Sequence, residues 1–246
     1  MTAVAATLPK ARVTSETGDP VRRLNPRIVD TDWLVLRGLR RALAARLAEV
    51  ARPGMSLIDF GCGSQPYASL VEDAGCTYRG ADFGPGADLA IGADGKLGAA
   101  DNSADLVLSV QVLEHVRDLA TYFAEAKRVL RPEGALILST HGSWLYHPHP
   151  EDHRRWTREG LVGDIEAHGF EVVSCEAVVG PLAWTTLLRL TCFAFPLRKA
   201  PLVGKPLTAL LALVMNARAF VEDKVTPAWV TRDNACVYVT LCRPRP

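Results

Sequence analysis

The chain has 246 residues, of which 48% are hydrophobic and 22% charged, and its formal net charge is +1. This length accommodates one large α/β domain with a sizeable core. The near-neutral balance, without a block of lysines and arginines, argues against a nucleic-acid partner. Six scattered cysteines form no CxxC pair and no zinc-type spacing, and no signal peptide is recognisable, which together predict a reducing, cytoplasmic location.

The N-terminal segment, residues 1–25, contains no continuous apolar run and is predicted to be a flexible tail, so that the folded domain covers 26–246. Apolar residues then recur with helical spacing from Asp32 to Val50, and Pro53-Gly54 ends this helix. A turn is predicted at Arg131–Gly134 because a Pro-Glu-Gly sequence separates a helical segment from an apolar run.

Short apolar runs alternate with helical segments along the rest of the chain. The candidate strands are Ser56–Phe60, Thr77–Asp82, Ala87–Ile91, Asp105–Val110, Ala135–Thr140, Phe170–Val178 and Ala235–Cys242. This alternation predicts an α/β fold with a doubly wound, mostly parallel seven-stranded sheet covered by helices on both faces. Ligands in such folds bind beyond the carboxyl ends of the strands.

Two glycines follow the first predicted strand in the sequence Asp59-Phe60-Gly61-Cys62-Gly63. Glycine at Gly61 and Gly63 leaves backbone amides open to an anionic group, although a plain strand-to-helix turn has the same sequence pattern. Asp82 ends the next strand, nineteen positions after Gly63. Doubly wound folds place an acid there that accepts hydrogen bonds from ribose hydroxyls.

Two further residues refine the kind of cofactor. Pro66 stands where dinucleotide sites have their third glycine, which argues against NAD and against an oxidoreductase. Asp94 follows the third strand, where it is either an acceptor for an amino group of a base or a solvated acid in a turn.

The segments IDFGCG (58–63), GAD (80–82), DLVLSVQVLEHV (105–116) and RVLRPEGALILST (128–140) resemble the class I S-adenosylmethionine-dependent methyltransferases, in particular the type 11 branch. The resemblance covers roughly residues 55–178 and implies a Rossmann-like fold with S-adenosylmethionine as cofactor. It assigns the methionine end to Asp59, Gly61 and Gly63, with Cys62 between them, and the ribose to Asp82. It also places Asp94 at the adenine and Gln111 near the sulfonium. Phe83, which directly follows Asp82, is expected as a further adenine neighbour.

One departure from the family pattern concerns the adenine side. GKLGAA follows Asp94, where LPF commonly stands in the family, and this weakens the assignment of Asp94 to the adenine.

Four of the six histidines, His141, His147, His149 and His153, lie in one segment directly after the fifth strand. Methyl transfer to a hydroxyl needs a general base, and histidine suits that role near neutral pH. His141 or His147 is the predicted base, with His153 as the third choice. A metal site is the alternative, but the stiff His-Pro-His-Pro sequence does not assemble a tetrahedral ligand set, so no metal is predicted. His115 is interpreted as a packing residue.

An unusually long connection, about 179–234, separates the last two strands. Arg189 is its only charged residue before Leu197, but Gly180, Pro181 and Pro196 interrupt the apolar run and disfavour a membrane span. We expect two or three packed helices that form a lid, a homodimer surface or an acceptor pocket. The alternative is an interfacial patch that contacts a membrane peripherally, with a lipid-linked acceptor.

These observations favour a methyltransferase that acts on a hydroxyl, or on an amine, of a small-molecule, glycan or lipid-linked acceptor. The protein is then expected in the cytoplasm or at the membrane surface. A non-catalytic, methyltransferase-like binding module is the alternative, and the presence of Asp59, Gly61, Gly63 and Asp82 argues against such a degenerate pocket.

Overall fold

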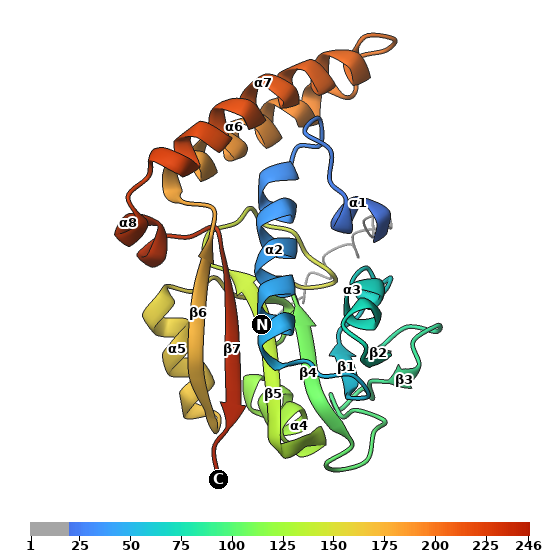
Figure 1. Cartoon of the computed structure of the whole chain (residues 1–246). Helices are drawn as coiled ribbons and strands as arrows, with labels where there is room; N and C mark the ends of the chain where they lie inside the picture. The colour runs from blue at the N-terminus through green and yellow to red at the C-terminus, as the bar shows by residue number, and fades with distance from the viewer. Residues whose placement is uncertain (1–19) are drawn as a thin grey trace, which may run out of the picture.

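The computed structural model describes residues 20–246, and Figure 1 shows a central sheet with helices on both sides. The sheet has seven strands in the order β3-β2-β1-β4-β5-β7-β6. β7 alone runs in the opposite direction to the other strands, so the predicted mostly parallel sheet is confirmed. The strands are β1 (Ser56–Phe60), β2 (Thr77–Asp82), β3 (Leu89–Ala90), β4 (Ala104–Val110), β5 (Leu130–His141), β6 (Phe170–Val178) and β7 (Val237–Pro244).

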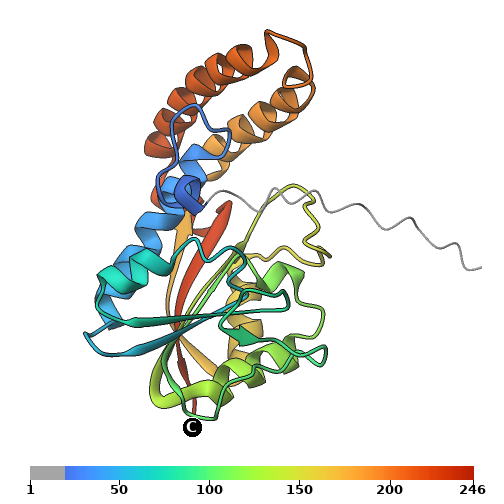
Figure 2. The same cartoon turned by 90° about the vertical axis from the view of Figure 1, so that its right-hand side faces the viewer.

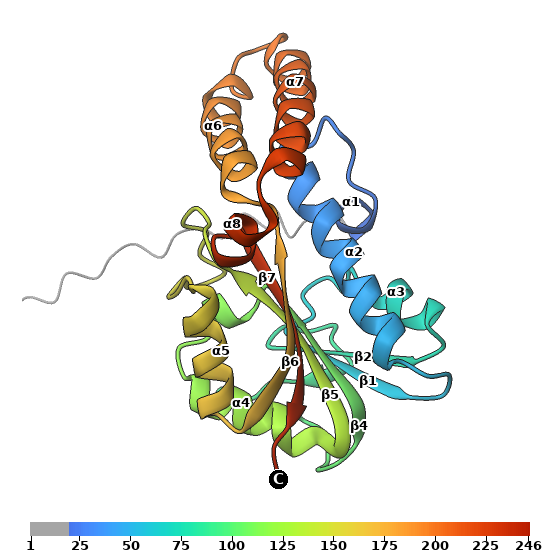
Figure 3. The ribbon, with the colours of Figure 1, turned by 60° about the vertical axis from the view of Figure 1, so that its left-hand side comes forward.

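Helices cover both faces of the sheet because neighbouring strand residues alternate between two apolar clusters. Leu57 packs in the cluster beneath α2, whereas Ile58 packs in the cluster beneath α4 and α5. Figure 3 shows α2 and α3 on one face of the sheet and α4 and α5 on the other. Their bounds are α1 (Pro20–Leu24), α2 (Trp33–Val50), α3 (Ala68–Asp73), the 3-10 turn η1 (Leu113–His115), α4 (Leu119–Val129) and α5 (Arg158–Ala167).

Three boundaries differ from the sequence-based expectation. The third strand is only two residues long. The predicted turn at Arg131–Gly134 lies inside β5, where it forms an irregularity between the pairs Ala104↔Leu130 and Leu106↔Ala135. Most of the predicted tail, 1–25, lies outside the described residues, but 20–24 form helix α1 rather than flexible chain.

The segment between β6 and β7 is helical, as predicted, and consists of α6 (Pro181–Leu197), α7 (Gly204–Val225) and α8 (Ala228–Asp233). Helices α6 and α7 form a hairpin that projects beyond the sheet (Figure 2). The amide of Asn216 on α7 donates to the backbone oxygens of Ile28 and Asp30 at 2.7 and 2.8 Å, which fixes the hairpin to the chain before α2. Within 20–246, none of the helices combines the length and the hydropathy that crossing a membrane requires.

Candidate functional site

The chain leaves β1 through a tight turn at Gly61. The backbone of Gly61 is left-handed, with φ of +84°, and its N–H donates to the backbone oxygen of Ala81 at 2.9 Å. A Cβ at this position would stand 2.6 Å from Cγ2 of Val112. Glycine is therefore required at position 61 by backbone conformation and by space.

Gly63 and Asp82 meet at the carboxyl ends of β1 and β2. The expectation that the two glycines leave backbone amides open is wrong, because the N–H groups of Gly61 and Cys62 donate to the backbone oxygen of Ala81 and that of Gly63 donates to Asp82. The N–H of Gly63 donates to Oδ2 of Asp82 at 2.7 Å, and the N–H of Phe83 donates to Oδ1 at 2.7 Å. No atom lies within 4 Å of the place where a Cβ of Gly63 would stand, so the backbone there faces open space.

A cavity of about 320 Å³ lies beside this pair. Its lining includes residues that the sequence interpretation missed, although a Gly-Pro-Gly run directly after β2 is a recognisable signal for an open loop. The lining residues are Gly63, Ser64, Gln65, Asp82, Gly84, Pro85, Gly86 and Ala87.

Asp59 is buried near the end of β1 and accepts a hydrogen bond from the hydroxyl of Tyr78 at 2.7 Å. Burial, together with the negative charge of Asp82, raises the pKa of Asp59 to about 7, although the Tyr78 hydrogen bond and Arg23 act in the opposite direction. Asp59 is thus a proton-binding group close to neutral pH beneath the glycine turn.

The other predicted cofactor residues have unequal surroundings. Gln111, in a left-handed conformation, is held at the end of β4 by its Nε2, which donates to Ser139 Oγ at 3.1 Å. Cys62 is buried, and burial raises the pKa of its thiol. Phe83 is 71% exposed, so its ring is free to contact a ligand. Asp94 is exposed and accepts from the backbone N–H of Lys96 at 3.2 Å. Its carboxylate therefore stabilises the local turn.

His141 and Glu114 form a buried pair at the carboxyl end of β5. Nδ1 of His141 lies 2.7 Å from Oε1 of Glu114, and the Thr140 hydroxyl donates to Oε2 at 2.8 Å. Burial alone would raise the pKa of Glu114, but the proximity and charge of His141 outweigh it, so the pKa is lowered and Glu114 is a carboxylate. Glu114 lies in the segment 105–116 that carries the family resemblance, but no role in the site was predicted for it from the sequence.

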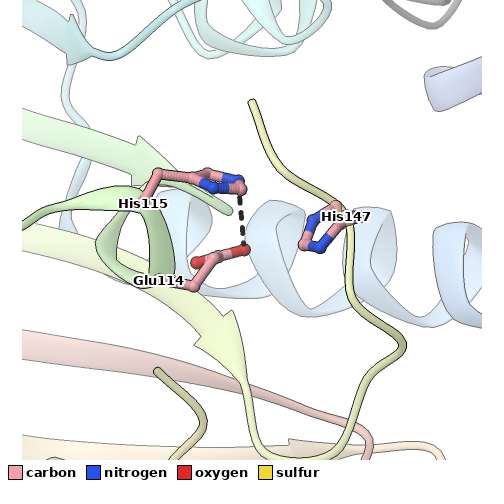
Figure 4. A group of neighbouring side chains, drawn as sticks. All are labelled: Glu114, His115 and His147. Carbon is pink, nitrogen blue, oxygen red and sulfur yellow. Dashed lines mark ion pairs between the residues drawn. The ribbon is translucent and has the colours of Figure 1, made fainter. Parts of the chain in front are cut away.

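Glu114, His115 and His147 also converge, as Figure 4 shows. Each offers one ligand atom, and these atoms lie within 4.8 Å of one another. Nε2 of His115 is 4.0 Å from Oε1 of Glu114. Burial and the neighbouring His141 lower the pKa of His147 to about 4, so His147 is uncharged at neutral pH. From its sequence, the His-Pro-His-Pro segment is not expected to assemble metal ligands. Its first histidine, His147, nevertheless lies beside two other potential ligands, Glu114 and His115.

His153, the third predicted base, is oriented differently. Its Nε2 lies 3.0 Å from Oε2 of Glu151, and its backbone N–H donates to the backbone oxygen of Glu114 at 2.8 Å. The loop backbone is therefore tied to the site, while the imidazole of His153 contacts an exposed acid.

A stack of aromatic rings connects His141 to the helical hairpin. His141 stacks on Trp144 with ring centres 4.8 Å apart, and Trp144 stacks on Trp184 of α6 with centres 4.9 Å apart. His147 packs edge-on against His141, with ring centres 4.8 Å apart. The ring of His141 is thus packed between residues of the histidine-rich loop, which in turn contact the base of the hairpin.

Comparison with known proteins gives a family match over the region that holds this site. A family model described as a methyltransferase domain matches residues 35–175. These residues run from α2 to β6 and include both halves of the site.

The chain is also similar to individual proteins. It is 30% identical over 136 residues to a probable S-adenosylmethionine-dependent methyltransferase of Mycolicibacterium smegmatis, covering 48% of this chain and 53% of that protein. It is 28% identical to a ubiquinone biosynthesis O-methyltransferase of Cereibacter sphaeroides, covering 54% of this chain and 67% of the relative. The chain thus spans about half the length of the first curated relatives it matches.

The fold is shared with solved structures of low sequence identity. A Burkholderia thailandensis 1,6-didemethyltoxoflavin-N1-methyltransferase, solved with S-adenosylhomocysteine, superimposes with a TM-score of 0.53 at 18% identity. That match covers 85% of this chain and 79% of the other.

Proposed function

Because this chain belongs to the class I S-adenosylmethionine-dependent methyltransferases, we propose that it transfers a methyl group to a hydroxyl, or to an amine, of a small-molecule acceptor. The observation that carries this proposal is the buried Glu114–His141 pair at the carboxyl end of β5, with Nδ1 and Oε1 2.7 Å apart. The two atoms are close without meeting the geometry of a hydrogen bond, and we propose that this proximity orients the ring so that its other nitrogen accepts a proton.

The cofactor pocket has the features that S-adenosylmethionine needs. The backbone at Gly63 is bare of side chains, and with buried Asp59 nearby we propose that it takes the amino-acid end of that cofactor. The N–H of Gly63 already donates to Asp82, so this contact is not assigned to a free amide. Each carboxylate oxygen of Asp82 accepts one backbone N–H and retains a lone pair for a ribose hydroxyl. Phe83 and Asp94 are the proposed neighbours of the adenine. Gln111 is proposed to lie near the sulfonium, and Cys62 is proposed to line the methionine end of the cofactor site. When bound, the cofactor supplies a methyl group activated by a positive sulfur.

His141 is the base that we propose among the three candidates. Glu114 orients Nδ1 of His141, so Nε2 takes the proton from the acceptor while the ring is held between Trp144 and His147. The pKa of about 4 makes His147 a weak base, and His153 contacts Glu151. His147 is therefore proposed to shape the acceptor pocket.

We propose that the reaction needs no metal ion. Three potential ligands converge at Glu114, but Oε2 of that carboxylate accepts from the Thr140 hydroxyl at 2.8 Å, and Oε1 stands 2.7 Å from Nδ1 of His141, although not in hydrogen-bond geometry. A metal would have to replace at least one of these contacts. The cluster is better explained as an oriented base with neighbouring imidazoles that exclude water.

The names of the relatives support oxygen as the acceptor atom, since one of them is an O-methyltransferase of ubiquinone biosynthesis. A glycan or a lipid-linked molecule with a free hydroxyl also meets this requirement. The cytoplasm, or the membrane surface facing it, is the proposed location. A binding module without turnover is disfavoured by the oriented Glu114–His141 pair, which a cofactor-binding role alone does not require.

The test combines calorimetry with a turnover assay. Titration with S-adenosylmethionine and with NAD should show binding of the first only. Release of S-adenosylhomocysteine is then measured with a panel of phenols, methyl glycosides and amines. On the best acceptor, His141→Ala and Glu114→Gln should lower kcat about 10²- to 10⁴-fold without weakening cofactor binding.

Control variants separate the base from other histidines. His168→Ala changes a histidine at the end of α5 whose Nδ1 contacts the Asp164 backbone, and it should retain the wild-type rate. Full activity of His141→Ala on every active acceptor would remove this base from the mechanism, whereas binding of NAD alone would overturn the proposed function.

A further inference from the structure

We propose that the outer half of the α6–α7 hairpin, residues 189–210, docks on the surface of an anionic lipid membrane. This segment, called here the hairpin tip, comprises the end of α6, the connecting loop and the start of α7. It lies at the end of the hairpin farthest from the sheet (Figures 1 and 2). The proposal concerns an interaction surface and does not depend on the methyl-transfer chemistry.

Large apolar side chains of the hairpin tip face solvent. Leu202 in the loop is 100% exposed, and Phe195 and Phe193 are 69% and 60% exposed. Val203 at the end of the loop and Leu207 and Leu210 on the first turns of α7 are exposed as well. Six exposed large apolar side chains within one segment of the chain are more than ordinary surface requires, which favours an interaction site.

The hairpin does not need these side chains for its own packing. The inner face of α6 is formed by Ala183, Leu187, Leu190 and Ala194, which are buried at the three- and four-residue spacing of one helix face. At the base, the Thr186 hydroxyl donates to Glu222 of α7. The packing of α6 therefore uses these buried residues, whereas the exposed apolar side chains of the hairpin tip are left without a packing role in the hairpin.

The charge of the hairpin selects the kind of partner. No Asp or Glu occurs between Val179 and Val221, whereas Arg189, Arg198, Lys199 and Lys205 are all in the tip and all exposed. Arg198 also donates to the Thr31 hydroxyl at 3.3 Å. A purely cationic surface with aromatic and aliphatic side chains complements anionic headgroups above an acyl layer.

A second copy of the chain is a poorer occupant. A two-fold interface brings the same patch of both copies together, so Arg198, Lys199 and Lys205 would face their own equivalents. Insertion across the bilayer is also not expected, because no helix among the described residues has the character of a span. Interfacial binding satisfies both the charge and the shallow apolar surface.

The hairpin rises from the edge of the sheet that carries the proposed base. Val237 of β7 pairs with His141 of β5 and, on its other side, with Val178 of β6. The chain enters the hairpin directly after Val178, and Trp184 at its base stacks on Trp144. Docking of the tip would therefore bring the proposed base toward the lipid surface.

Co-sedimentation with vesicles tests the proposal, using the full chain and vesicles of phosphatidylcholine with or without phosphatidylglycerol. Wild type should bind the anionic vesicles, and salt should weaken binding. The double variants Phe195→Ser/Leu202→Ser and Lys199→Glu/Lys205→Glu should each partition at least about tenfold less. Matched controls are Val173→Ser, an exposed apolar residue of β6, and Arg41→Glu, an exposed cation of α2; both should bind like wild type.

The outcomes distinguish a lipid membrane from a second copy of the chain as the partner of the hairpin tip. Absence of wild-type binding, or equal losses in the control variants, would overturn the proposal. A wild-type dimer in light scattering that both tip variants convert to monomer, without vesicle binding, would assign the tip to self-association instead. Tip variants should keep their calorimetric affinity for S-adenosylmethionine, and Asp82→Ala should keep vesicle binding, so failure here is distinguishable from failure of the proposed enzyme function.

Discussion

Replacing Asp59 by asparagine is expected to remove a loss of stability that the wild-type protein suffers as the pH rises from about 4 to about 7. Asp59 is 2% exposed and its pKa in the folded protein is about 7, against an ordinary 3.8. In this interval the unfolded chain releases the Asp59 proton while the folded chain retains it. Stability falls with increasing pH wherever the folded state holds more protons.

The magnitude follows from the two pKa values. At about 1.4 kcal/mol for each pH unit, a pKa of about 7 instead of 3.8 corresponds to about 4 kcal/mol. This contribution stabilises the fold fully below about pH 4 and is lost once the pH has passed about 7. The amide introduced by Asp59→Asn does not titrate, so the free energy of unfolding of the variant minus that of wild type should increase by up to about 4 kcal/mol over this range.

Urea denaturation of both proteins at half-unit pH intervals measures that difference. The amide also changes the contact with Tyr78, but this adds an offset that is the same at every pH, so the slope is the relevant quantity. Tyr78→Phe is the companion variant: it removes a hydrogen bond that lowers the pKa of Asp59, so the loss of stability should extend to higher pH. Parallel pH curves for wild type and Asp59→Asn would show that Asp59 is ionised in the fold, and would refute the reasoning.

Three other substitutions or treatments test the remaining parts of the site. Asp82→Ala should raise the calorimetric Kd for S-adenosylmethionine about ten- to a hundredfold, because hydrogen bonds to a charged acceptor are lost. Asp94→Ala should raise this Kd less than about fivefold. An equal rise in Kd for both variants would make Asp94 a direct ligand of the cofactor. Gly61→Ala should lower the free energy of unfolding by about 2–4 kcal/mol in urea titrations, since it combines a left-handed backbone with a clash. Adding Val112→Ala should restore the part due to the clash, and a wild-type-like single variant would contradict the close approach. Dialysis against EDTA should leave kcat within about twofold, whereas loss of activity together with a stoichiometric metal would assign the histidine cluster to metal binding.

The sequence predicts most of the sheet because buried parallel strands are continuous apolar runs with punctuation at both ends. The bounds of β1, β2 and β6 coincide with the predicted ones. The turn predicted at Arg131–Gly134 falls within the bounds of β5, where it interrupts the pairing with β4: four residues stand between the pairs Ala104↔Leu130 and Leu106↔Ala135. Such an insertion depends on the partner strand and cannot be inferred from local residue types.

The proposed cofactor site was easier to predict than the Glu114–His141 pair. Gly61, Gly63 and Asp82 occupy positions defined by backbone conformation and strand ends, which sequence patterns encode directly. The role of Glu114 depends on contacts with His141 across 27 residues of chain, and no local spacing specifies that the two side chains meet. Of the three histidines, the sequence could nominate His141 and His147 but could not say which one a buried carboxylate would orient.

One register position connects the two proposals. Because Val237 lies between His141 on one side and Val178 on the other, the proposed base and the root of the hairpin are level at the same edge of the sheet. The rings of Trp144 and Trp184 bridge them. An acceptor with a hydroxyl head and an apolar tail could then reach His141 along the hairpin while its tail stays at the lipid surface. Such an arrangement would explain why the connection between β6 and β7 is long, apolar and free of acids over 179–221, whereas a soluble acceptor would require none of these properties.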